Sequence, residues 1–307
     1  MFARELERLL GLGSVREYAS LAERTTWRVG GPARWSCEPD TAHLAGVLAL
    51  ASAYGVPTYV LGRGSNVLVD DEGLPGLLVS TRDRMRTVDV VGSTLVAEAG
   101  VPLPALARAV AHLGYGGYEF LIGIPGTVGA GIAMNAGLTA RGVHDVSGVL
   151  VDADVVTTSR VQETWGPDRL ALRYRGSSVL DERAIVIRGR FALTERSDAA
   201  TIRHRTAEHL AERRRKQPLS RPTAGSTFRQ PSGGPPAGAL IDGAGLKGLR
   251  VGKAMVSHKH ANWIETEPGA RAADVRALIN QIRHEVAARY DIVLEREVRY
   301  LPQDYDG

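Results

Sequence analysis

Three polar side chains in the sequence are of types that could act on a small anionic molecule. They are Ser226 between Gly225 and Thr227, Arg175 beside a tyrosine, and Glu297 within a run of alternating charges. A carboxyl group beside a guanidinium can orient a carboxylate substrate or stabilise an enol. Ser226 has no Gly-x-Ser-x-Gly elbow and no evident His and Asp partners, so we expect a hydroxyl donor rather than a nucleophile. Taken singly, these positions are also typical of turns and exposed strand edges.

A glycine-rich segment indicates what kind of ligand this chemistry serves. Residues 122–137 hold five glycines, one proline and one asparagine among small apolar side chains. Glycine lets backbone amides approach a bound group, and successive exposed amides form an anion-binding nest. The apolar side chains Ile124, Val128, Ile132 and Met134 anchor the segment to a core, unlike a flexible linker. The segment therefore predicts contact with a large, phosphate-bearing cofactor.

Two smaller glycine clusters precede it, at residues 26–33 and 61–70. The second follows an apolar run and predicts a strand, a tight glycine turn and another strand. No amphipathic helix begins after Gly64, so the pattern differs from a Rossmann dinucleotide fingerprint. Each cluster alone is more typical of a structural turn. Three of them in one chain favour a shared ligand.

The composition indicates a globular protein and excludes several classes. The chain has 307 residues, 44% of them hydrophobic, a net charge of +4 and one cysteine, Cys37, which we expect to be buried. The sequence shows no membrane-spanning run and no signal-peptide core, so the expected compartment is the cytoplasm. We expect no nucleic-acid partner and no metal site. The basic run 213–216 is interpreted as the solvated face of a helix, with the alternative that one or two of its cations meet an anionic small molecule.

The pattern of short strands and single helices predicts an α+β organisation. Helices are expected near 44–51, ending at Gly55, and from Pro104 through Val110, and strands at 77–79, 87–91, 95–98, 148–156 and 184–193. A polar helical connector is expected over 198–216. Beyond it we expect strands at 253–256 and 262–266, an amphipathic helix from about 272 to 290 and a last strand over 292–301.

Nine short motifs, in order along the chain, resemble the family of UDP-N-acetylenolpyruvoylglucosamine reductases, also called UDP-N-acetylmuramate dehydrogenases. The resemblance extends from about residue 21 to residue 301. The motifs are Thr-x-Arg-x-Gly-Gly-Pro-Ala, Gly-x-Gly-Ser-Asn-x-Leu-x-x-Asp, Gly-Ile-Pro-Gly-Thr-Val-Gly, Met-Asn-Ala-Gly, Tyr-Arg-x-Ser, Gly-Ser-x-Phe, Gly-Leu-Lys-Gly, His-Ala-Asn and Glu-Val-Arg.

The resemblance implies an α+β protein with an FAD-binding domain of the p-cresol methylhydroxylase or vanillyl-alcohol oxidase type, made of two α+β subdomains, and a smaller α+β substrate domain. The implied boundaries are an N-terminal helical segment at 1–20, the FAD-binding domain at 21–195, with subdomains at about 21–82 and 83–195, and the substrate-binding domain at 196–307. Non-covalent FAD would be reduced by NADPH and would pass hydride to the enolpyruvyl double bond of a UDP-sugar, giving UDP-N-acetylmuramate.

The resemblance also implies residue roles. Ser226 would protonate the enol intermediate, and Arg175 and Glu297 would stabilise charge on the enolpyruvyl carboxylate, Glu297 only if it is protonated or helps to deliver a proton. The implied substrate contacts are Lys216, Gln230, His260 and Arg299. The implied FAD contacts are Leu61, Gly62, Arg63, Gly64, Ser65, Asn66, Val67, Gly123, Ile124, Pro125, Gly126, Thr127, Gly129, Ala130, Asn135, Ala136 and Gly137.

Several positions depart from the family pattern. Gln230 replaces the usual asparagine before proline, residues 138–141 replace the usual Ala-Tyr-Gly, and the residues after His-Ala also differ. Only fifty residues separate Arg175 from Ser226, without an evident inserted tyrosine loop, which indicates the shorter subgroup. The departures fit a divergent ordinary enzyme, and also a paralogue that reduces a different enol ether.

Two alternatives of other classes stay open. A flavin oxidase of the same cofactor fold would use oxygen as acceptor, whereas a reductase is reduced by NADPH and reoxidised slowly in air. A non-catalytic flavin-binding module would not need Arg175, Ser226 and Glu297 together.

Overall fold

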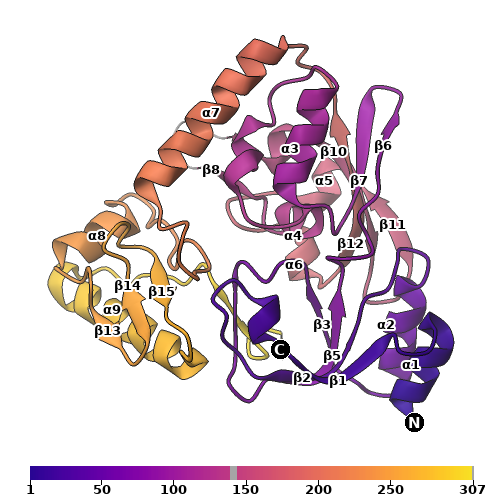
Figure 1. Cartoon of the computed structure of the whole chain (residues 1–307), viewed down its shortest axis with the longest axis horizontal. Helices are drawn as coiled ribbons and strands as arrows, with labels where there is room; N and C mark the ends of the chain where they lie inside the picture. The colour runs from indigo at the N-terminus through magenta and orange to yellow at the C-terminus, as the bar shows by residue number, and fades with distance from the viewer. Residues whose placement is uncertain (139–143, 306–307) are drawn as a thin grey trace. The chain divides into compact units, whose positions relative to one another are not determined.

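The structure, a computed structural model, describes residues 1–138 and 144–305. The chain forms two compact units, which are described separately (Figure 1). The first unit consists of residues 1–16, 35–63 and 77–212, and the second of residues 17–34, 64–76 and 213–307. The domain boundaries expected near residues 20, 82 and 195 stay a prediction.

The centre of the first unit is an antiparallel sheet of five strands in the order β11-β10-β12-β7-β6. Gly189 of β12 pairs with Ala153 of β10 on one side and Ala97 of β7 on the other. A Cβ at Gly189 would lie 2.6 Å from Cδ1 of Ile132 in the helix α4 (Val128–Ala133), so glycine here lets the helix pack closely on the sheet. The strands are β6 (Val88–Val91), β7 (Thr94–Glu98), β10 (Leu150–Val156), β11 (Gln162–Trp165) and β12 (Ile185–Ala192).

Helices and short strands complete this unit. They are α1 (Phe2–Leu10), α2 (Leu44–Ala53), β3 (Thr58–Leu61), α3 (Leu103–His112), η2 (Glu119–Gly123), α4 (Val128–Ala133), β8 (Gly137–Leu138), β9 (His144–Asp145), η3 (Val146–Gly148), α5 (Pro167–Leu170) and α6 (Ser178–Asp181). One apolar cluster fills the unit, with Trp165 and Phe191 among its largest fully buried side chains. Burial of this amount of apolar surface is the main favourable term for folding the unit.

Four elements include residues of both units. They are β1 (Val15–Ser20), β2 (Pro32–Cys37), β5 (Leu74–Ser80) and α7 (Ala199–Lys216). The sheet β1-β2-β5-β3 ends in a parallel pair, with Thr58 of β3 opposite Leu77 of β5. The turn that leaves β3 carries residues 62–66, so the sheet fixes the start of one predicted glycine cluster.

The second unit has a three-stranded sheet, β13-β14-β15, with the long helix α9 packed on β13 and β14. In Figure 1 these elements are drawn in orange and yellow. Residues from early in the chain complete its core, in which Trp27 and Leu68 are fully buried beside Phe228. The elements are η1 (Ala22–Arg24), β4 (Val67–Val69), α8 (Ala237–Gly243), β13 (Arg250–Val251), β14 (Ala254–Val256), β15 (Ile264–Thr266), α9 (Ala272–Tyr290) and β16 (Arg299–Leu301).

Most expected elements are confirmed with shifts of one to three residues. The helix expected at 272–290 has those bounds, and its predicted apolar face, residues 275, 278, 279, 282 and 286, is buried. The connector expected at 198–216 is α7, and Cys37 is buried. Among the described residues, no helix is both long and apolar enough to cross a membrane.

Two expectations about the second unit are wrong. The strand expected over 292–301 is present only as β16, because its parallel partner β4 has three residues. The preceding residues pair instead with Phe228 and its neighbours, through an isolated bridge at Arg296. The basic run 213–216 is not wholly solvated either, since Arg213 is 8% exposed and burial lowers its pKa to about 10.

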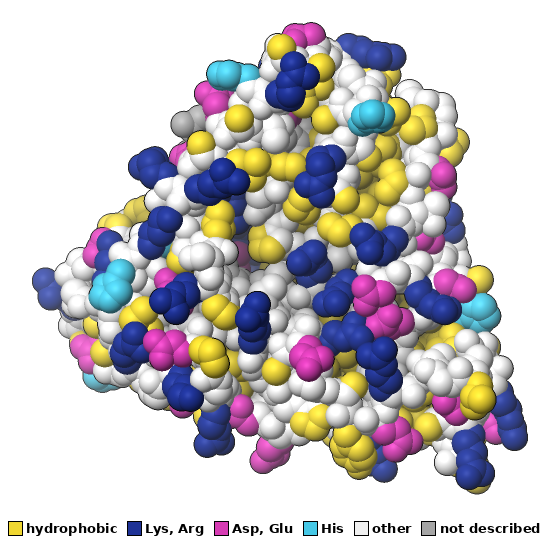
Figure 2. Space-filling model, viewed as in Figure 1, with side chains coloured by type: hydrophobic (Ala, Val, Ile, Leu, Met, Phe, Trp, Pro, Cys, Tyr) yellow, Lys and Arg dark blue, Asp and Glu magenta, His cyan; other side chains and the backbone are white. Residues whose placement is uncertain are grey.

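Figure 2 shows Lys and Arg side chains together with acidic and hydrophobic ones on the face in view.

Candidate active site

In the second unit, backbone pairing brings Ser226 and Glu297 onto neighbouring segments. The amide of Thr227, next to Ser226, donates to Asn262 O at 2.8 Å. The carbonyl of Thr227 accepts the amide of Glu297 at 2.9 Å, and Ser226 itself forms a bridge with Trp263. Residues 226–229 thus lie between residues 262–263 and residues 295–298. This arrangement places the predicted proton donor, Ser226, and the predicted acid, Glu297, on two hydrogen-bonded backbone segments.

The glycine turn after β3 holds the segment that carries Glu297 and Arg299. Asn66 donates from Nδ2 to Glu297 O at 3.2 Å, and Asn66 O accepts the amide of Arg299 at 3.1 Å. Gly64 has a φ of +58° and a Cβ there would collide with Arg24 O, so only glycine fits. The predicted cofactor residue Asn66 therefore also positions predicted catalytic and substrate residues.

His260 is held in one tautomer. Its Nδ1 lies 3.3 Å from the amide of Asn262, which donates to it, so a neutral ring carries its proton on Nε2. Burial lowers the pKa of His260, and the charges of Lys247 and Lys216 lower it further. The ring packs at 5.9 Å from that of Trp263. His260 is thus a neutral donor through Nε2 at physiological pH.

The remaining predicted substrate contacts have defined surroundings. Gln230 Oε1 accepts the amide of Ala237 at 2.9 Å at the start of α8. Arg299 is half-buried and donates to Asp304 O at 3.1 Å. Lys216 is exposed at the last residue of α7.

In the first unit, Arg175 occupies a tight turn. Arg173 and Gly176 exchange backbone hydrogen bonds of 3.0 and 3.1 Å, and Arg175 between them has a φ of +55°. Its Nη2 donates to Gly137 O at 3.3 Å. Ser177, with no exposed surface, donates to Ala133 O at 2.8 Å at the end of α4. These bonds attach the turn to the glycine-rich segment.

The glycine-rich segment differs from the expected nest. A short helix, α4, begins inside it after Thr127, and the amides of Val128 and Gly129 donate to Val101 O and Ala99 O at 2.8 and 2.9 Å. These two amides are therefore not available to an anion. Backbone pairing with residues 99–101 uses them because α4 has to dock against the sheet.

Other features of this unit fit a close-packed ligand. A Cβ at Gly62 would lie against Thr127 Oγ1, so the two segments approach each other only because residue 62 is glycine. The Thr127 hydroxyl is buried and has no hydrogen-bond partner among the described residues. An orphaned buried hydroxyl beside a cradle shaped by glycine is what a bound cofactor would complete. The residues present fit an FAD site.

Asn135 has a structural role in addition to its predicted one. Its Oδ1 accepts the amide of Ser147 at 3.0 Å, and the backbone φ of Asn135 is +42°. Asparagine tolerates this left-handed conformation better than most residues. The departure expected over residues 138–141 falls largely on 139–141, which lie outside the described residues.

Two stretches of the chain match models of known domains. Residues 217–301 match the UDP-N-acetylenolpyruvoylglucosamine reductase C-terminal domain, and residues 38–160 match an FAD-binding domain. A UDP-N-acetylenolpyruvoylglucosamine reductase of Synechococcus sp. (strain JA-3-3Ab) is 41% identical over 94% of this chain and 92% of the relative. One from Rubrobacter xylanophilus is 41% identical over 91% of this chain and 92% of the relative. The crystal structure of the Thermus caldophilus reductase superposes with a TM-score of 0.79 at 35% identity, covering 94% of this chain and 100% of that one.

The chain belongs to the UDP-N-acetylenolpyruvoylglucosamine reductase family. It is an FAD-dependent oxidoreductase of peptidoglycan precursor synthesis, with an FAD-binding domain of the p-cresol methylhydroxylase type and the C-terminal domain of the family. The fold class, family and cofactor expected from the sequence are confirmed. Among the described residues, no group of acidic, His and Cys side chains could hold a metal ion.

The two units of this reductase divide the predicted site residues. The first contains Arg175, residues 61–63 and those from 123 to 137, and the second contains residues 64–67, Lys216, Ser226, Gln230, His260, Glu297 and Arg299. Sequence reasoning did not single out Asn262, although the His-Ala-Asn motif contains it. Asn262 is almost completely buried, and this burial, which marks it as a residue of interest, is visible only in the structure.

Proposed function

We propose that this enzyme reduces the enolpyruvyl group of UDP-N-acetylglucosamine enolpyruvate with NADPH, giving UDP-N-acetylmuramate. The observation that supports this most strongly is the backbone hydrogen bonding that holds the Ser226 segment beside the segment of Glu297. FAD, when bound, accepts hydride from NADPH and supplies it to the enolpyruvyl double bond. The protein then has to orient the substrate, stabilise charge and deliver one proton.

Ser226 is proposed as the proton donor. Hydride addition at one carbon of the enolpyruvyl group leaves negative charge shared with the carboxylate, and the adjacent carbon takes a proton. A hydroxyl held in place by a hydrogen-bonded backbone segment is already positioned to give that proton. Arg175 is proposed to stabilise the developing charge, and the Glu297 carboxyl to contribute as an acid or hydrogen-bond donor.

The proposed substrate contacts suit an anionic UDP-sugar. Lys216 and Arg299 are cations for diphosphate or carboxylate oxygens, and the Nε2–H of neutral His260 and the amide of Gln230 are hydrogen-bond donors. FAD is proposed to contact residues 61–67 and the positions 123–127, 129, 130 and 135–137. Gly62 and Thr127 supply the local fit described above.

The shorter subgroup of the family is proposed for this chain. The residues between Arg175 and Ser226 form α6, β12 and α7, and these elements leave little chain for an inserted tyrosine loop. Action in the cytoplasm is proposed from the sequence.

The decisive experiment replaces the proton donor. In Ser226→Ala we expect anaerobic reduction of the flavin by NADPH to be unchanged, because that step takes no proton from Ser226. Reoxidation by UDP-N-acetylglucosamine enolpyruvate should fall at least about 1,000-fold. Stopped-flow absorbance of the flavin measures both steps, and Ser232→Ala, in an exposed position of the following loop, is the control.

Equal losses in the two half-reactions would contradict the role of Ser226. Failure of the wild-type enzyme to be reoxidised by this substrate would favour a paralogue with a different enol ether. Rapid reoxidation by oxygen alone would favour a flavin oxidase.

A further inference from the structure

Asn262 is a buried residue whose side chain hydrogen-bonds one backbone position with both its oxygen and its nitrogen. It is 1% exposed, Oδ1 accepts the amide of Phe228 at 2.9 Å, and Nδ2 donates to Phe228 O at 2.8 Å. This two-point contact reproduces the pairing that a neighbouring strand would give. It fixes the backbone two residues after Ser226.

The main chain of Asn262 makes two further bonds to the same region. Its carbonyl accepts the amide of Thr227 at 2.8 Å, and its amide donates to His260 Nδ1 at 3.3 Å. Ser257 supports this turn, since its Oγ accepts the amides of Lys259 and His260 at 3.1 and 3.4 Å. Asn262 thus connects the Ser226 segment to the His260 ring, whose position and tautomer it helps to set.

We propose that Asn262 is a positioning residue that holds Ser226 and His260 in a single frame for the reduction. The proposal rests on the proposed roles of these two residues. Asn262 makes no contact with substrate in this scheme. It acts by preventing the residues 226–228 from moving relative to the turn at 257–263.

The expected consequence is selective for one half-reaction. Proton transfer from Ser226 depends steeply on geometry, and a displacement near 1 Å can reduce such a step by about 100-fold. Reduction of the flavin by NADPH does not use this proton. A defect in the frame should therefore slow reoxidation alone and make proton transfer rate-limiting.

The test uses Asn262→Ala in the full-length, FAD-loaded protein, since alanine keeps both backbone bonds and removes both side-chain bonds. We expect reduction by NADPH to change less than about 3-fold and reoxidation by the enolpyruvyl substrate to fall about 100-fold. The solvent deuterium isotope effect on reoxidation should rise above that of the wild type. A residue with only a structural role would not raise it.

A second variant keeps the test falsifiable if Asn262→Ala does not fold. Asn262→Gln keeps a neutral amide donor and acceptor on a side chain one methylene longer, so its reoxidation rate should lie between those of wild type and Asn262→Ala. The matched control is Thr266→Val on the nearby β15. It removes a buried hydrogen bond of 2.6 Å to Trp27 O in the same unit and should leave the isotope effect unchanged.

Equal slowing of the two half-reactions in Asn262→Ala, or wild-type reoxidation in a folded variant, would overturn the proposal. Ser226→Ala separates this failure from that of the proposed function. If Ser226→Ala blocks reoxidation and Asn262→Ala does not, only the frame is wrong. If Ser226→Ala is reoxidised normally, the role of Ser226 fails and the frame has nothing to position.

Discussion

At the scale of single residues, Arg175 combines a predicted catalytic role with an unfavourable backbone conformation. Its φ of +55° lies in the left-handed region, where an L residue other than glycine is disfavoured by about 1 kcal/mol. Such conformations persist where the surrounding structure imposes them, often at functional sites. The paired turn between Arg173 and Gly176 imposes this one.

Replacing Arg175 by glycine should therefore separate stability from activity. In Arg175→Gly we expect the free energy of unfolding to stay equal or rise by up to about 1 kcal/mol, because glycine accepts positive φ. Flavin reoxidation by the enolpyruvyl substrate should fall by about 100-fold or more, because the guanidinium is lost. Urea unfolding and stopped-flow kinetics measure the two effects.

Arg183 provides the matched control. It is exposed and also has a φ of +55°. Arg183→Gly should show the same small change in stability with full activity. Wild-type reoxidation in Arg175→Gly would remove Arg175 from the proposed mechanism.

At the scale of elements, two acidic residues after β4 fix the long helix of the second unit. Asp71 accepts the amides of Ala272 and Ala273 at 2.7 and 2.9 Å, and Asp70 pairs with Arg276 at 2.6 Å. The first amides of a helix have no partner within it, so a carboxylate from elsewhere in the chain serves as a cap. The two residues after β4 are thereby connected to α9.

Loss of this cap should weaken the second unit. We expect Asp71→Ala to lower the free energy of unfolding by about 1 to 2 kcal/mol, because two helix amides lose their acceptor. Urea denaturation followed by circular dichroism checks this value. The exposed neighbour Glu72 is the control, and Glu72→Ala should change stability by less than about 0.5 kcal/mol. Equal effects of the two substitutions would show that the cap contributes little.

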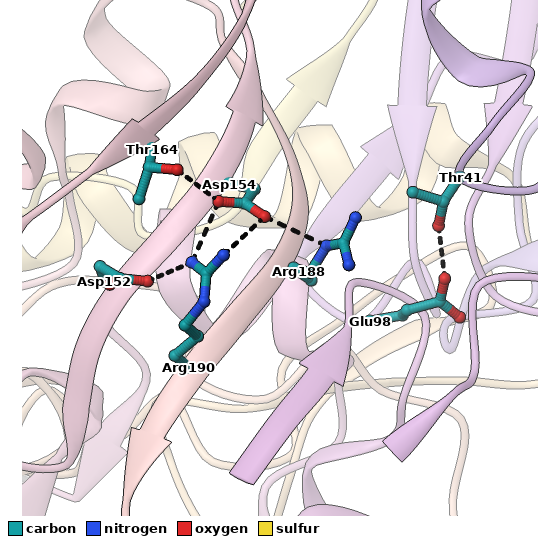
Figure 3. A network of polar contacts seen from close by, with 7 residues as sticks. All are labelled: Thr41, Glu98, Asp152, Asp154, Thr164, Arg188 and Arg190. Carbon is teal, nitrogen blue, oxygen red and sulfur yellow. Dashed lines mark hydrogen bonds and ion pairs between the residues drawn. The ribbon is translucent and has the colours of Figure 1, made fainter. Parts of the chain in front are cut away.

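In the first unit, an ion-pair network joins strands β10, β11 and β12. Figure 3 shows Arg190, Arg188 and Thr164 directed at Asp154, and Arg190 also pairs with Asp152. Burial by itself raises the pKa of Asp154, but the hydrogen bonds of Arg190 and Thr164 and the two arginine charges outweigh burial and lower it overall. The side chain of Asp154 is 6% exposed.

This lowered pKa makes the stability of the network dependent on pH. Asp154 binds a proton more weakly in the folded than in the unfolded chain, so its contribution is complete above the unfolded pKa of about 3.9. It is lost as the pH falls from there through the lower folded pKa. We expect Asp154→Asn to cost about 2 kcal/mol at pH 7 and progressively less below pH 4. Urea unfolding at pH 7, 4 and 3 measures the difference.

The more exposed Asp152 serves for comparison. Its side chain is 24% exposed and contacts Arg190 alone among the ion pairs of the network. Asp152→Asn should therefore cost less than Asp154→Asn at pH 7. A cost for Asp154→Asn that stays constant between pH 7 and pH 3 would contradict the assigned shift.

At the scale of the whole molecule, the second unit is assembled from three separate stretches of chain. Trp27 Nε1 donates to Ile264 O at 2.8 Å, β4 pairs with β16 from Val67 to Val69, and Asp71 caps α9. Trp27 and Leu68 also belong to the buried core. The unit therefore needs residues 17–34 and 64–76 as well as residues 213–307.

A fragment of residues 196–307 tests this dependence. We expect it not to fold cooperatively, because it lacks the Trp27 and Leu68 side chains and the strand partner of β16. Amide NMR spectra and thermal melting followed by circular dichroism would show poor dispersion and no sharp transition. A well-dispersed spectrum for this fragment would instead support the boundary near residue 195 as that of an autonomous domain.

The sequence by itself determined the features that local patterns and motifs encode. The apolar spacing from Val275 to Val286 defined α9, and the ordered motifs identified the family, its flavin and its reaction. These features were accessible because helix periodicity and glycine turns depend on residues close together in the chain.

Only the tertiary structure decided how the site is held. Residues 295–298 were expected to extend the last strand, yet they pair with residues 227–229, and the amides of Val128 and Gly129 serve the sheet rather than a ligand. Asn66 reaches Glu297, and Asn262 reaches Phe228. The physical reason is that a buried backbone group takes whichever partner packing brings near. No local pattern encodes a partner that lies 34 or 231 residues away in sequence.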